Sequence, residues 1–428
     1  MLKRIGKQIR KLFSVKELRS KLLFTLAIFF VFRFLAHIPV PAVNAQELQR
    51  IFFQSDFLSL LNVFSGGTLV RSSIVAVGIN PYITSSIIMQ LAGMVVPKIK
   101  EMQQDGESGR NKLNQYTRLL TIPIAIVQSA SVIALLKSQN LLLSDDIYTL
   151  VIIIATLVAG SMILMWLGEL ISINGLGNGI SMVMFAGIAS QLPMTFIQTA
   201  SLGKSKQYMV LATFILMFLL VVSLVVFMND AIRKIKIQYA RRIKGGRSYG
   251  GHSSHLPVKV NIAGVMPIIF SVSLMMVPTF LARLMTASQN ESLMYWGEKI
   301  VLWFSQTSPI YMICYFALVF IFTFFSSVIF FNAEDLADNL KKSGAFIPGI
   351  RPGGPTKKYL EFVVTRITFA GALFLGLIAL LPSFVQAFTS IGSLAVSGTS
   401  ILIIVSVILE TSKQVESMTV GQNYEKYV

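Results

Sequence analysis

Few residues of this sequence have the types and spacing that catalytic or metal-binding chemistry requires. His252 and His255, in the stretch GHSSH, could ligate a metal ion, but no carboxylate or cysteine assists them. The GLGNG stretch at 175–179 has the glycines of a phosphate-binding loop, but no strand precedes it and no P-loop lysine follows it. We expect it to be a tight turn between two helices. The single cysteine, Cys314, excludes a disulfide framework and a cysteine metal site. The sequence therefore predicts no enzyme, no metal ion and no cofactor.

Charged residues are also sparse inside the apolar stretches of the chain. Arg33 is the only one well inside such a stretch, and Glu169 and Glu410 lie at the ends of two others. An ion-coupled transporter keeps ionisable residues near the bilayer midplane to bind its coupling ion. Their scarcity favours an apolar constriction, which blocks ions by dewetting.

The composition is that of a membrane protein. Of 428 residues, 54% are hydrophobic and only 13% are charged, whereas a soluble domain has a charged share of about a quarter. Windows of about 20 apolar residues mark membrane-crossing helices. The predicted fold class is an all-α polytopic membrane protein with ten spans, near residues 20–38, 72–97, 116–136, 147–169, 178–198, 208–228, 260–282, 308–331, 366–386 and 391–411.

The distribution of basic residues predicts the orientation. Of 37 Lys and Arg, 29 fall on one side of the membrane, seven fall on the other, and Arg33 lies inside the first span. Because basic loops stay in the cytoplasm, both termini are predicted to be cytoplasmic, including the tail at 413–428. Residues 1–19 combine basic residues with an apolar stripe, and no small-residue cleavage site follows the first span. They are predicted to form a retained amphipathic helix on the membrane surface.

Two of the apolar stretches contain a repeated motif. GINPYITSSIIM runs from 78 to 89 and GVMPIIFSVSLM from 264 to 275, five spans further along the chain. Because an odd number of spans reverses the direction through the membrane, the repeat predicts two inverted five-helix halves, 20–200 and 201–412. Interrupted helices that face each other in such a repeat line a pathway. The alternative is that Gly-x-x-Pro recurs by chance in apolar helices.

The stretch SDFLSLLNVFSGG, at 55–67, is apolar and too short to span a membrane. A helix of about ten residues reaches roughly 15 Å, half of the hydrocarbon core. Asp56 can cap its start, and Gly66 can end it. The sequence predicts a half-inserted helix between two full spans, either with a function of its own or as a re-entrant segment that fills space.

Two cytoplasmic loops, 229–259 and 332–366, are long, basic and rich in glycine. The first carries Arg241 and Arg242, and the second presents Arg351 on the turn GIRPG. Exposed guanidinium groups suit docking to a large acidic or RNA-containing partner. A solvated loop that only sets the membrane orientation would carry the same charge. No segment between spans is expected to be long enough for a folded extramembrane domain.

These motifs resemble those of the SecY family, the channel subunits of the general protein-secretion translocon. The resemblance rests on GINPYITSSIIMQL, EMQQDGESGRNKLNQYTR, MWLGELISINGLGNGISMVMFAGI, HLPVKVNIAGVMPIIF and ADNLKKSGAFIPGIRPG, and it runs in order across all ten spans. It implies a clamshell of two halves around an hourglass pore, with a lateral gate where spans 2 and 3 meet spans 7 and 8. It also implies a function: moving unfolded secretory polypeptides across the plasma membrane and releasing transmembrane segments sideways into lipid.

The resemblance implies roles for particular residues as well. An apolar pore ring would comprise Ile79, Ile83, Ile180, Met184, Ile269 and Ile403. The half helix would be a plug that closes the channel, formed by Asp56, Phe57, Leu58, Leu60, Leu61, Val63, Phe64 and Gly66. Thr84 and Gln128 would be polar contacts of the lateral gate, where a hydrogen bond stabilises the closed gate. Met184 departs from the isoleucine usual in such a ring, and ordinary helix packing is the alternative role for every ring position.

The same resemblance implies the partners. Arg241, Arg242, Arg247 and Arg351 are similar to docking sites for a SecA-like motor ATPase and the ribosome. One of these must supply the energy, because the sequence contains no nucleotide site. SecE-like and SecG-like small membrane subunits, signal sequences, nascent polypeptide and the lipid bilayer complete the expected partners. Two other functions stay open from the sequence, an inverted-repeat secondary transporter and a membrane receptor for ribosomes.

Overall fold

A computed structural model describes most of the chain. The described residues are 16–41, 43, 65–138, 141–142, 146–191, 193, 207–239, 242–244, 247–249, 253–262, 264, 266–286, 290–305, 308–389 and 392–425. Most of the predicted N-terminal amphipathic helix lies outside them, as do residues 55–64 of the half helix, Arg241 and His252.

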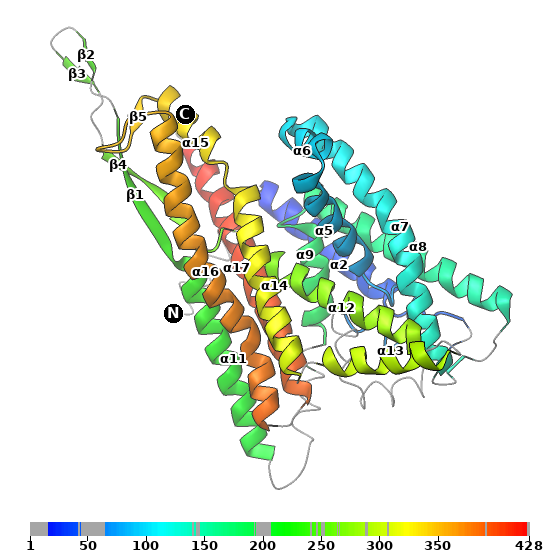
Figure 1. The fold of residues 1–428 in the computed structure, drawn as a ribbon. Helices are drawn as coiled ribbons and strands as arrows, with labels where there is room; N and C mark the ends of the chain where they lie inside the picture. The colour runs from blue at the N-terminus through cyan, green and yellow to red at the C-terminus, as the bar shows by residue number, and fades with distance from the viewer. Residues whose placement is uncertain are drawn as a thin grey trace.

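A helix overlaps each of the ten predicted spans (Figure 1). These helices are α2 (Lys16–Leu35), α5 (Asn80–Val95), α7 (Gly106–Ser138), α8 (Ile147–Asn174), α9 (Gly179–Ala189), α11 (Gln207–Asp230), α12 (Met266–Thr286), α14 (Pro309–Phe330), α16 (Gly354–Thr389) and α17 (Gly392–Glu425). Among the described residues, five helices are long and apolar enough to cross a membrane, or six if α5 and the adjoining α6 (Pro97–Gln104) form one bent span. The all-α polytopic fold class is confirmed, and the count of ten spans stays a prediction.

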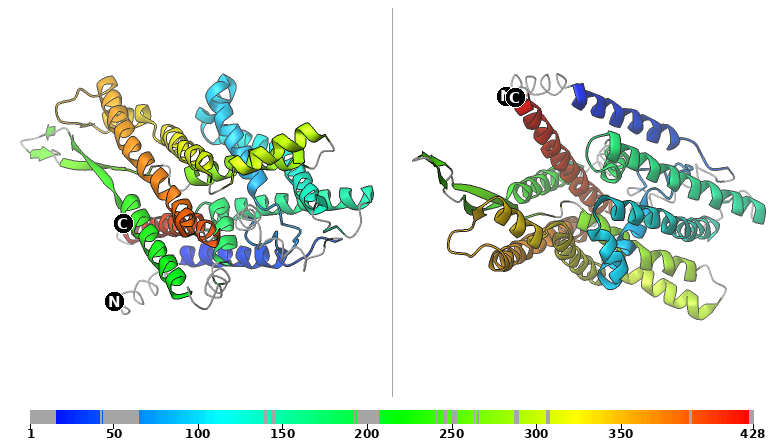
Figure 2. Two further views of the ribbon diagram at one scale, coloured as in Figure 1. Left: turned by 60° about the horizontal axis from the view of Figure 1, so that its bottom comes forward. Right: turned by 90° about the horizontal axis from the view of Figure 1, so that it is seen from above.

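The helices form two groups that meet along a few contacts. One group contains α2, α5, α7, α8 and α9, and the other contains α11, α12, α14, α16 and α17. The main contacts between the groups are those of α12 with α5 and α7, and that of α9 with α17. In the view from above in Figure 2, α17, in red, extends into the middle of the molecule. One hydrophobic core, built from both groups, fills the region between them.

The repeated Gly-x-x-Pro motif begins a helix at both of its occurrences. Gly78 and Gly264 have left-handed φ angles of 70° and 65°. Pro81 and Pro267 are each the second residue of the following helix, α5 or α12. Proline suits the first turn of a helix, where backbone N–H groups have no helical partner. The predicted span starts at 72 and 260 are wrong, because the motif starts each helix and does not interrupt one.

Each copy of the motif also makes the same hydrogen bond within its own helix. The hydroxyl of Ser85 donates to the carbonyl oxygen of Pro81 at 2.7 Å, and that of Ser271 donates to the carbonyl oxygen of Pro267 at 2.6 Å. Backbone conformation and side-chain bonding therefore repeat along with the sequence. This local equivalence favours a true internal repeat over chance recurrence of the motif.

The two basic loops fold together into a small unit. Strand β1 (Ile232–Tyr239) pairs antiparallel with β4 (Ser253–Lys259) and with β5 (Ala345–Phe346). Helix α15 (Ala333–Lys342) and the first turns of α16 pack with the sheet around a second hydrophobic core, formed by Ile235, Ile237, Val258, Ala333, Ala337, Leu340, Ala345, Ile347, Leu360 and Val364. The expectation that no extramembrane unit folds here is wrong. The buried isoleucines of β1 alternate with exposed basic residues, so the high charge concealed a period-two strand.

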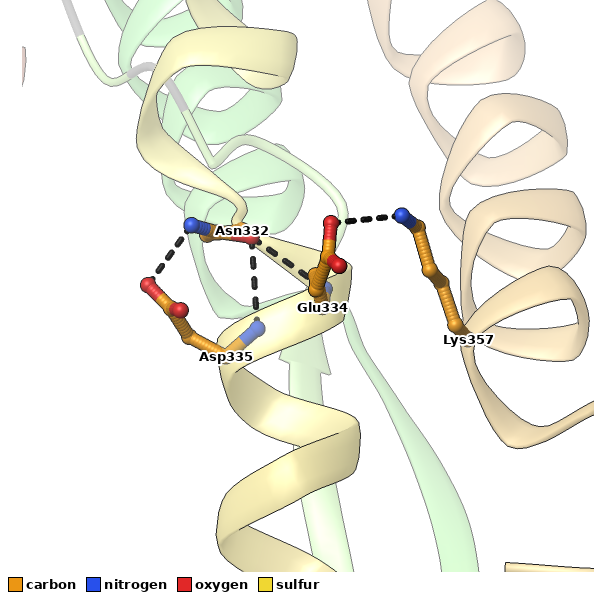
Figure 3. Close-up of polar contacts among 4 residues, drawn as sticks. All are labelled: Asn332, Glu334, Asp335 and Lys357. Atoms are coloured by element: carbon orange, nitrogen blue, oxygen red, sulfur yellow. Dashed lines mark hydrogen bonds and ion pairs between the residues drawn. The ribbon is translucent and has the colours of Figure 1, made fainter. Parts of the chain in front are cut away.

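Helix α15 begins at a side-chain cap, shown in Figure 3. The Oδ1 atom of Asn332 accepts hydrogen bonds from the backbone N–H groups of Glu334 and Asp335, at 3.1 and 3.3 Å. The Nδ2 atom of Asn332 donates to Oδ2 of Asp335 at 2.6 Å. Lys357, on α16, forms an ion pair with Glu334, with 2.6 Å between Nζ and Oε2. These contacts position α15 against α16 at the edge of the small sheet.

Three further elements bear on the predictions. GLGNG forms the predicted turn between α8 and α9, where the side chain of Asn178 caps α9. Helix α17 continues through most of the predicted tail, where Lys413 donates to the carbonyl oxygen of Asn229 at 2.6 Å and pairs with Asp230 at 3.1 Å. Helix α13 (Glu291–Trp303), between the helices of spans 7 and 8, was not predicted.

Candidate functional site

The six predicted ring residues come from the helices through which the two groups meet. Ile79 immediately precedes α5 and Ile83 lies in its first turn, while the other four lie on α9, α12 and α17. Five of the six side chains are at most 3% exposed, and the sixth, Ile180, is half-buried against the same core. All six positions therefore belong to, or pack against, the apolar cluster of buried residues to which both groups contribute.

A small cavity lies beside this cluster. Its lining includes Phe32, Gly66, Ile79, Leu164, Met184 and Gly187. Its volume of about 10 Å³ is the space of roughly one water molecule. Two ring side chains, Ile79 and Met184, thus share the cavity with the glycine that ends the predicted half helix.

The end of the half helix is buried against α9. Gly66 and Gly67 have left-handed φ angles of 72° and 78°, and both are buried. A Cβ atom on Gly66 would lie 2.6 Å from the Cα of Gly187, so the two backbones touch. The hydroxyl of Thr68 donates to the carbonyl oxygens of Ser65, at 2.7 Å, and Val75, at 3.0 Å, which stabilises the turns that follow. Of the predicted plug residues only Gly66 is described; Asp56, Phe57, Leu58, Leu60, Leu61, Val63 and Phe64 lie outside the described residues.

The two predicted gate residues are buried, but their predicted hydrogen bond is not formed. Thr84, on α5, donates through its hydroxyl to the carbonyl oxygen of Asn80 in its own helix, at 3.0 Å. In the part of the chain that the structure describes, Oε1 of Gln128, on α7, has no hydrogen-bond partner. The prediction failed because a threonine hydroxyl reaches the carbonyl four residues earlier without any help from another helix. An unpaired buried acceptor costs about 1–3 kcal/mol, so Gln128 is a weak point of this interface.

The turn that carries Arg351 is well supported. Ile347 is buried in the second core, and its carbonyl oxygen accepts from the N–H of Ile350 at 3.0 Å. The hydroxyl of Thr356 donates to the carbonyl oxygen of Arg351 at 2.9 Å. Gly349 and Gly353 have φ angles of 82° and 101°. The turn is thus fixed on both sides of Arg351, whose side chain is exposed.

The other predicted docking residues lie on a separate hairpin. Arg242 begins β2 (Arg242–Lys244) and Arg247 begins β3 (Arg247–Tyr249), and the two strands pair antiparallel. Figure 1 shows this hairpin extending beyond the ends of β1 and β4, at the edge of the molecule. Arg241 lies outside the described residues.

Sequence reasoning missed an ion pair between α7 and α8. Arg118 donates through Nε to Oε1 of Glu169 at 2.7 Å, and Nη2 of Arg118 lies 2.6 Å from Oε2 of Glu169. Glu169 was recognised only as a charge at a helix end. Its partner is 51 residues away in sequence, so no local pattern could identify it.

The chain is similar to known proteins along nearly its whole length. The SecY family model matches residues 73–412. The chain belongs to the SecY family. The protein translocase subunit SecY of Streptomyces galbus is 42% identical over 432 residues, covering 97% of this chain and 98% of the relative. The protein translocase subunit SecY of Mycobacterium bovis is 40% identical over 431 residues, covering 96% of this chain and 97% of the relative.

Solved structures of the same fold are more distant in sequence. A protein conducting channel matches with a TM-score of 0.63 and 19% identity, covering 93% of this chain and 92% of the other. Sec61 in the canine ribosome-channel complex matches with a TM-score of 0.59 and 18% identity, again covering 93% of this chain and 92% of the other. This SecY-family chain is therefore a multi-pass membrane protein and a protein translocase subunit, and the resemblance found in its motifs is confirmed. A secondary transporter is not favoured.

Proposed function

We propose that this chain is a passive protein-conducting channel that moves unfolded polypeptides across the plasma membrane and releases transmembrane segments sideways into lipid. The proposal is supported by the six ring residues, which lie in or against the core that both helix groups build, and by the cavity that Ile79 and Met184 line together with Gly66.

The ring chemistry suits this role. Flexible apolar side chains can pack around a passing chain of any sequence and offer it no polar partner to bind. The unbranched side chain of Met184 adapts to irregular shapes more readily than isoleucine does. With the pathway closed, the same side chains exclude water and ions.

The lateral gate belongs where α12 packs against α5 and α7. An apolar signal helix can replace these contacts with its own packing and then move into lipid. Because Oε1 of Gln128 accepts no hydrogen bond from the described residues, opening this interface breaks no bond between them and that atom. The two halves, 20–200 and 201–412, would then separate along the contacts of α12 and of α9 with α17.

Partner proteins would supply the energy for translocation and complete the complex. Arg351 and the hairpin with Arg242 and Arg247 would bind a SecA-like motor ATPase or the ribosome, and Arg241, the residue before Arg242 in the sequence, would take part. SecE-like and SecG-like subunits would complete the complex, and both termini would face the cytoplasm. The chain itself is proposed to have no catalytic activity.

Single-channel conductance in a planar bilayer tests the proposal. The intact chain with its small partner subunits is compared with a version that lacks Asp56 to Ser65. We expect the intact channel to be silent and the deletion to open intermittently, because the deletion removes the plug and leaves the ring. If both stay silent, with a signal peptide added as well, no aqueous pore lies behind the half helix and the channel proposal fails. A proton or sodium flux that depends on a small substrate would instead support a transporter.

A further inference from the structure

Helix α13 carries an exposed aromatic surface that the channel function does not explain. Tyr295, Trp296, Leu302 and Trp303 are 54%, 51%, 69% and 44% exposed. On a helix these four positions surround Lys299, at three and four residues before and after it. The ammonium group of Lys299 lies 4.4 Å from the ring centre of Tyr295 and 5.6 Å from that of Trp296.

The opposite side of α13 packs tightly on α12. Gly297 is buried, and a Cβ atom there would lie 2.7 Å from the carbonyl oxygen of Ala282 and 2.8 Å from Cγ2 of Thr286. This close approach fixes the rotation of α13 about its own axis. The aromatic surface must therefore face away from α12.

The position of α13 in the chain places this surface at a membrane boundary. The helix connects α12 to α14, both of which are apolar enough to span a membrane. Figure 1 shows α13 running beside α12 and pointing away from the end of α14, and α13 packs mainly on α12. The neighbouring helices also carry exposed apolar side chains, Leu281 on α12 and Ile310 and Ile313 on α14.

We propose that α13 is an interfacial lipid anchor whose surface of Tyr295, Trp296, Lys299, Leu302 and Trp303 lies in the headgroup region of the outer leaflet. Tryptophan and tyrosine favour this region because their rings are apolar and their polar ends stay hydrated. The stem of Lys299 lies along the rings while its ammonium group reaches the lipid phosphates. Since α13 packs on α12, lipid held by α13 also restrains a helix of the lateral gate.

The three tryptophans of the chain make the proposal directly testable. They are Trp166 on α8, and Trp296 and Trp303 on α13. Single-tryptophan versions, made by Trp→Phe substitutions at the other two positions, are reconstituted as full-length chains in phosphatidylcholine vesicles. The vesicles contain lipids brominated either near the headgroup or near the end of the acyl chain. Trp166 is exposed on a predicted span and serves as the control for lipid contact. Lys341→Trp, at an exposed position of α15 in a version without the three native tryptophans, serves as the control for water exposure.

We expect Trp296 and Trp303 to lose more fluorescence to bromine near the headgroup than to bromine at the chain end. With iodide on both sides of the membrane, we expect them to be shielded from it compared with Lys341→Trp. Quenching of both residues by iodide and not by either lipid would overturn the proposal by placing the surface in water. Protection from both quenchers would overturn it in favour of a protein partner. Stronger quenching from the chain end would place α13 in the bilayer centre and also contradict it.

Discussion

Gly66 and Gly187 meet backbone to backbone: a Cβ atom added to either would lie 2.6 Å from the Cα of the other. The contact joins the end of the predicted plug to α9, the helix that carries Ile180 and Met184. No side chain larger than hydrogen fits between the two segments.

We therefore predict that Gly187→Ala weakens the closed state. A methyl group here must displace Gly66, at a cost of about 1–3 kcal/mol for overpacking. α9 itself tolerates alanine, so the effect should appear as more frequent channel opening in single-channel recordings, with normal expression. Gly354→Ala is the matched control, because a Cβ atom there meets nothing within 4 Å. Equal opening frequencies for the two variants would mean that the contact does not keep the channel closed.

Polar substitution within the ring should also favour opening. Ile403 is fully buried, so Ile403→Asn leaves a buried amide without a partner and destabilises the closed packing by about 1–3 kcal/mol. We expect export of substrates with defective signal sequences to increase, as measured by the secreted fraction of such a substrate. Ile403→Val keeps the position apolar and should behave like the unmodified chain. Unchanged secretion with Ile403→Asn would show that Ile403 is not part of the ring.

The left-handed backbone conformation of Gly264, in the repeated motif, can be tested by a substitution that causes no steric clash with described residues. Among the described residues, a Cβ atom on Gly264 would meet only Oε2 of Glu410, at 3.8 Å, so Gly264→Ala introduces no clash with them. It does force an L-residue into a left-handed conformation, which costs roughly 1–2 kcal/mol. We expect a lower Tm in detergent, and no decrease for Gly354→Ala. A Tm equal to that of the unmodified chain would mean that the turn before α12 can relax.

The cap of α15 should control the stability of the small cytoplasmic unit. Asn332→Ala removes the acceptor of two backbone N–H groups, at a cost of about 1 kcal/mol. We expect hydrogen exchange of the α15 amides to become about fivefold faster. Lys357→Ala leaves the cap intact and removes only an exposed ion pair, so it should change exchange much less. The reverse order would make the ion pair, and not the cap, the main local contact.

Charge reversal at Arg351 should weaken binding to the partner on the cytoplasmic face. The supported turn fixes the backbone of Arg351. Lys342 is the last residue of α15, in the same small unit. We expect Arg351→Glu to reduce ribosome and motor binding in a flotation or co-sedimentation assay, and Lys342→Glu, an equal change of charge, to reduce it far less. Equal losses would indicate a general electrostatic attraction. Loss of all function with Arg351→Glu, together with no effect of Ile403→Asn, would support a receptor and contradict a channel.

The sequence by itself determined the features that depend on short stretches of chain. Apolar runs located the helices, because a span requires about 20 consecutive apolar residues whatever lies beside it. The start of α5 was predicted too early, at 72, although Gly78 and Pro81 mark the true start, since left-handed φ and a missing N–H are properties of single residues. The GLGNG turn at 175–179 was recognisable because glycine is a turn-forming residue wherever it occurs.

Only the tertiary structure decided which distant residues meet. Thr84 bonds within its own helix and not to Gln128, and Arg118 pairs with Glu169 across 51 residues. Strand β5 pairs with β1 although more than a hundred residues separate them in sequence, so neither basic loop alone indicated that the two share a core. The closeness of Ile79 to Met184, and of Gly66 to Gly187, likewise depends on how whole helices pack. Such contacts are chosen by the shape and burial of the assembled helices, and no local pattern encodes them.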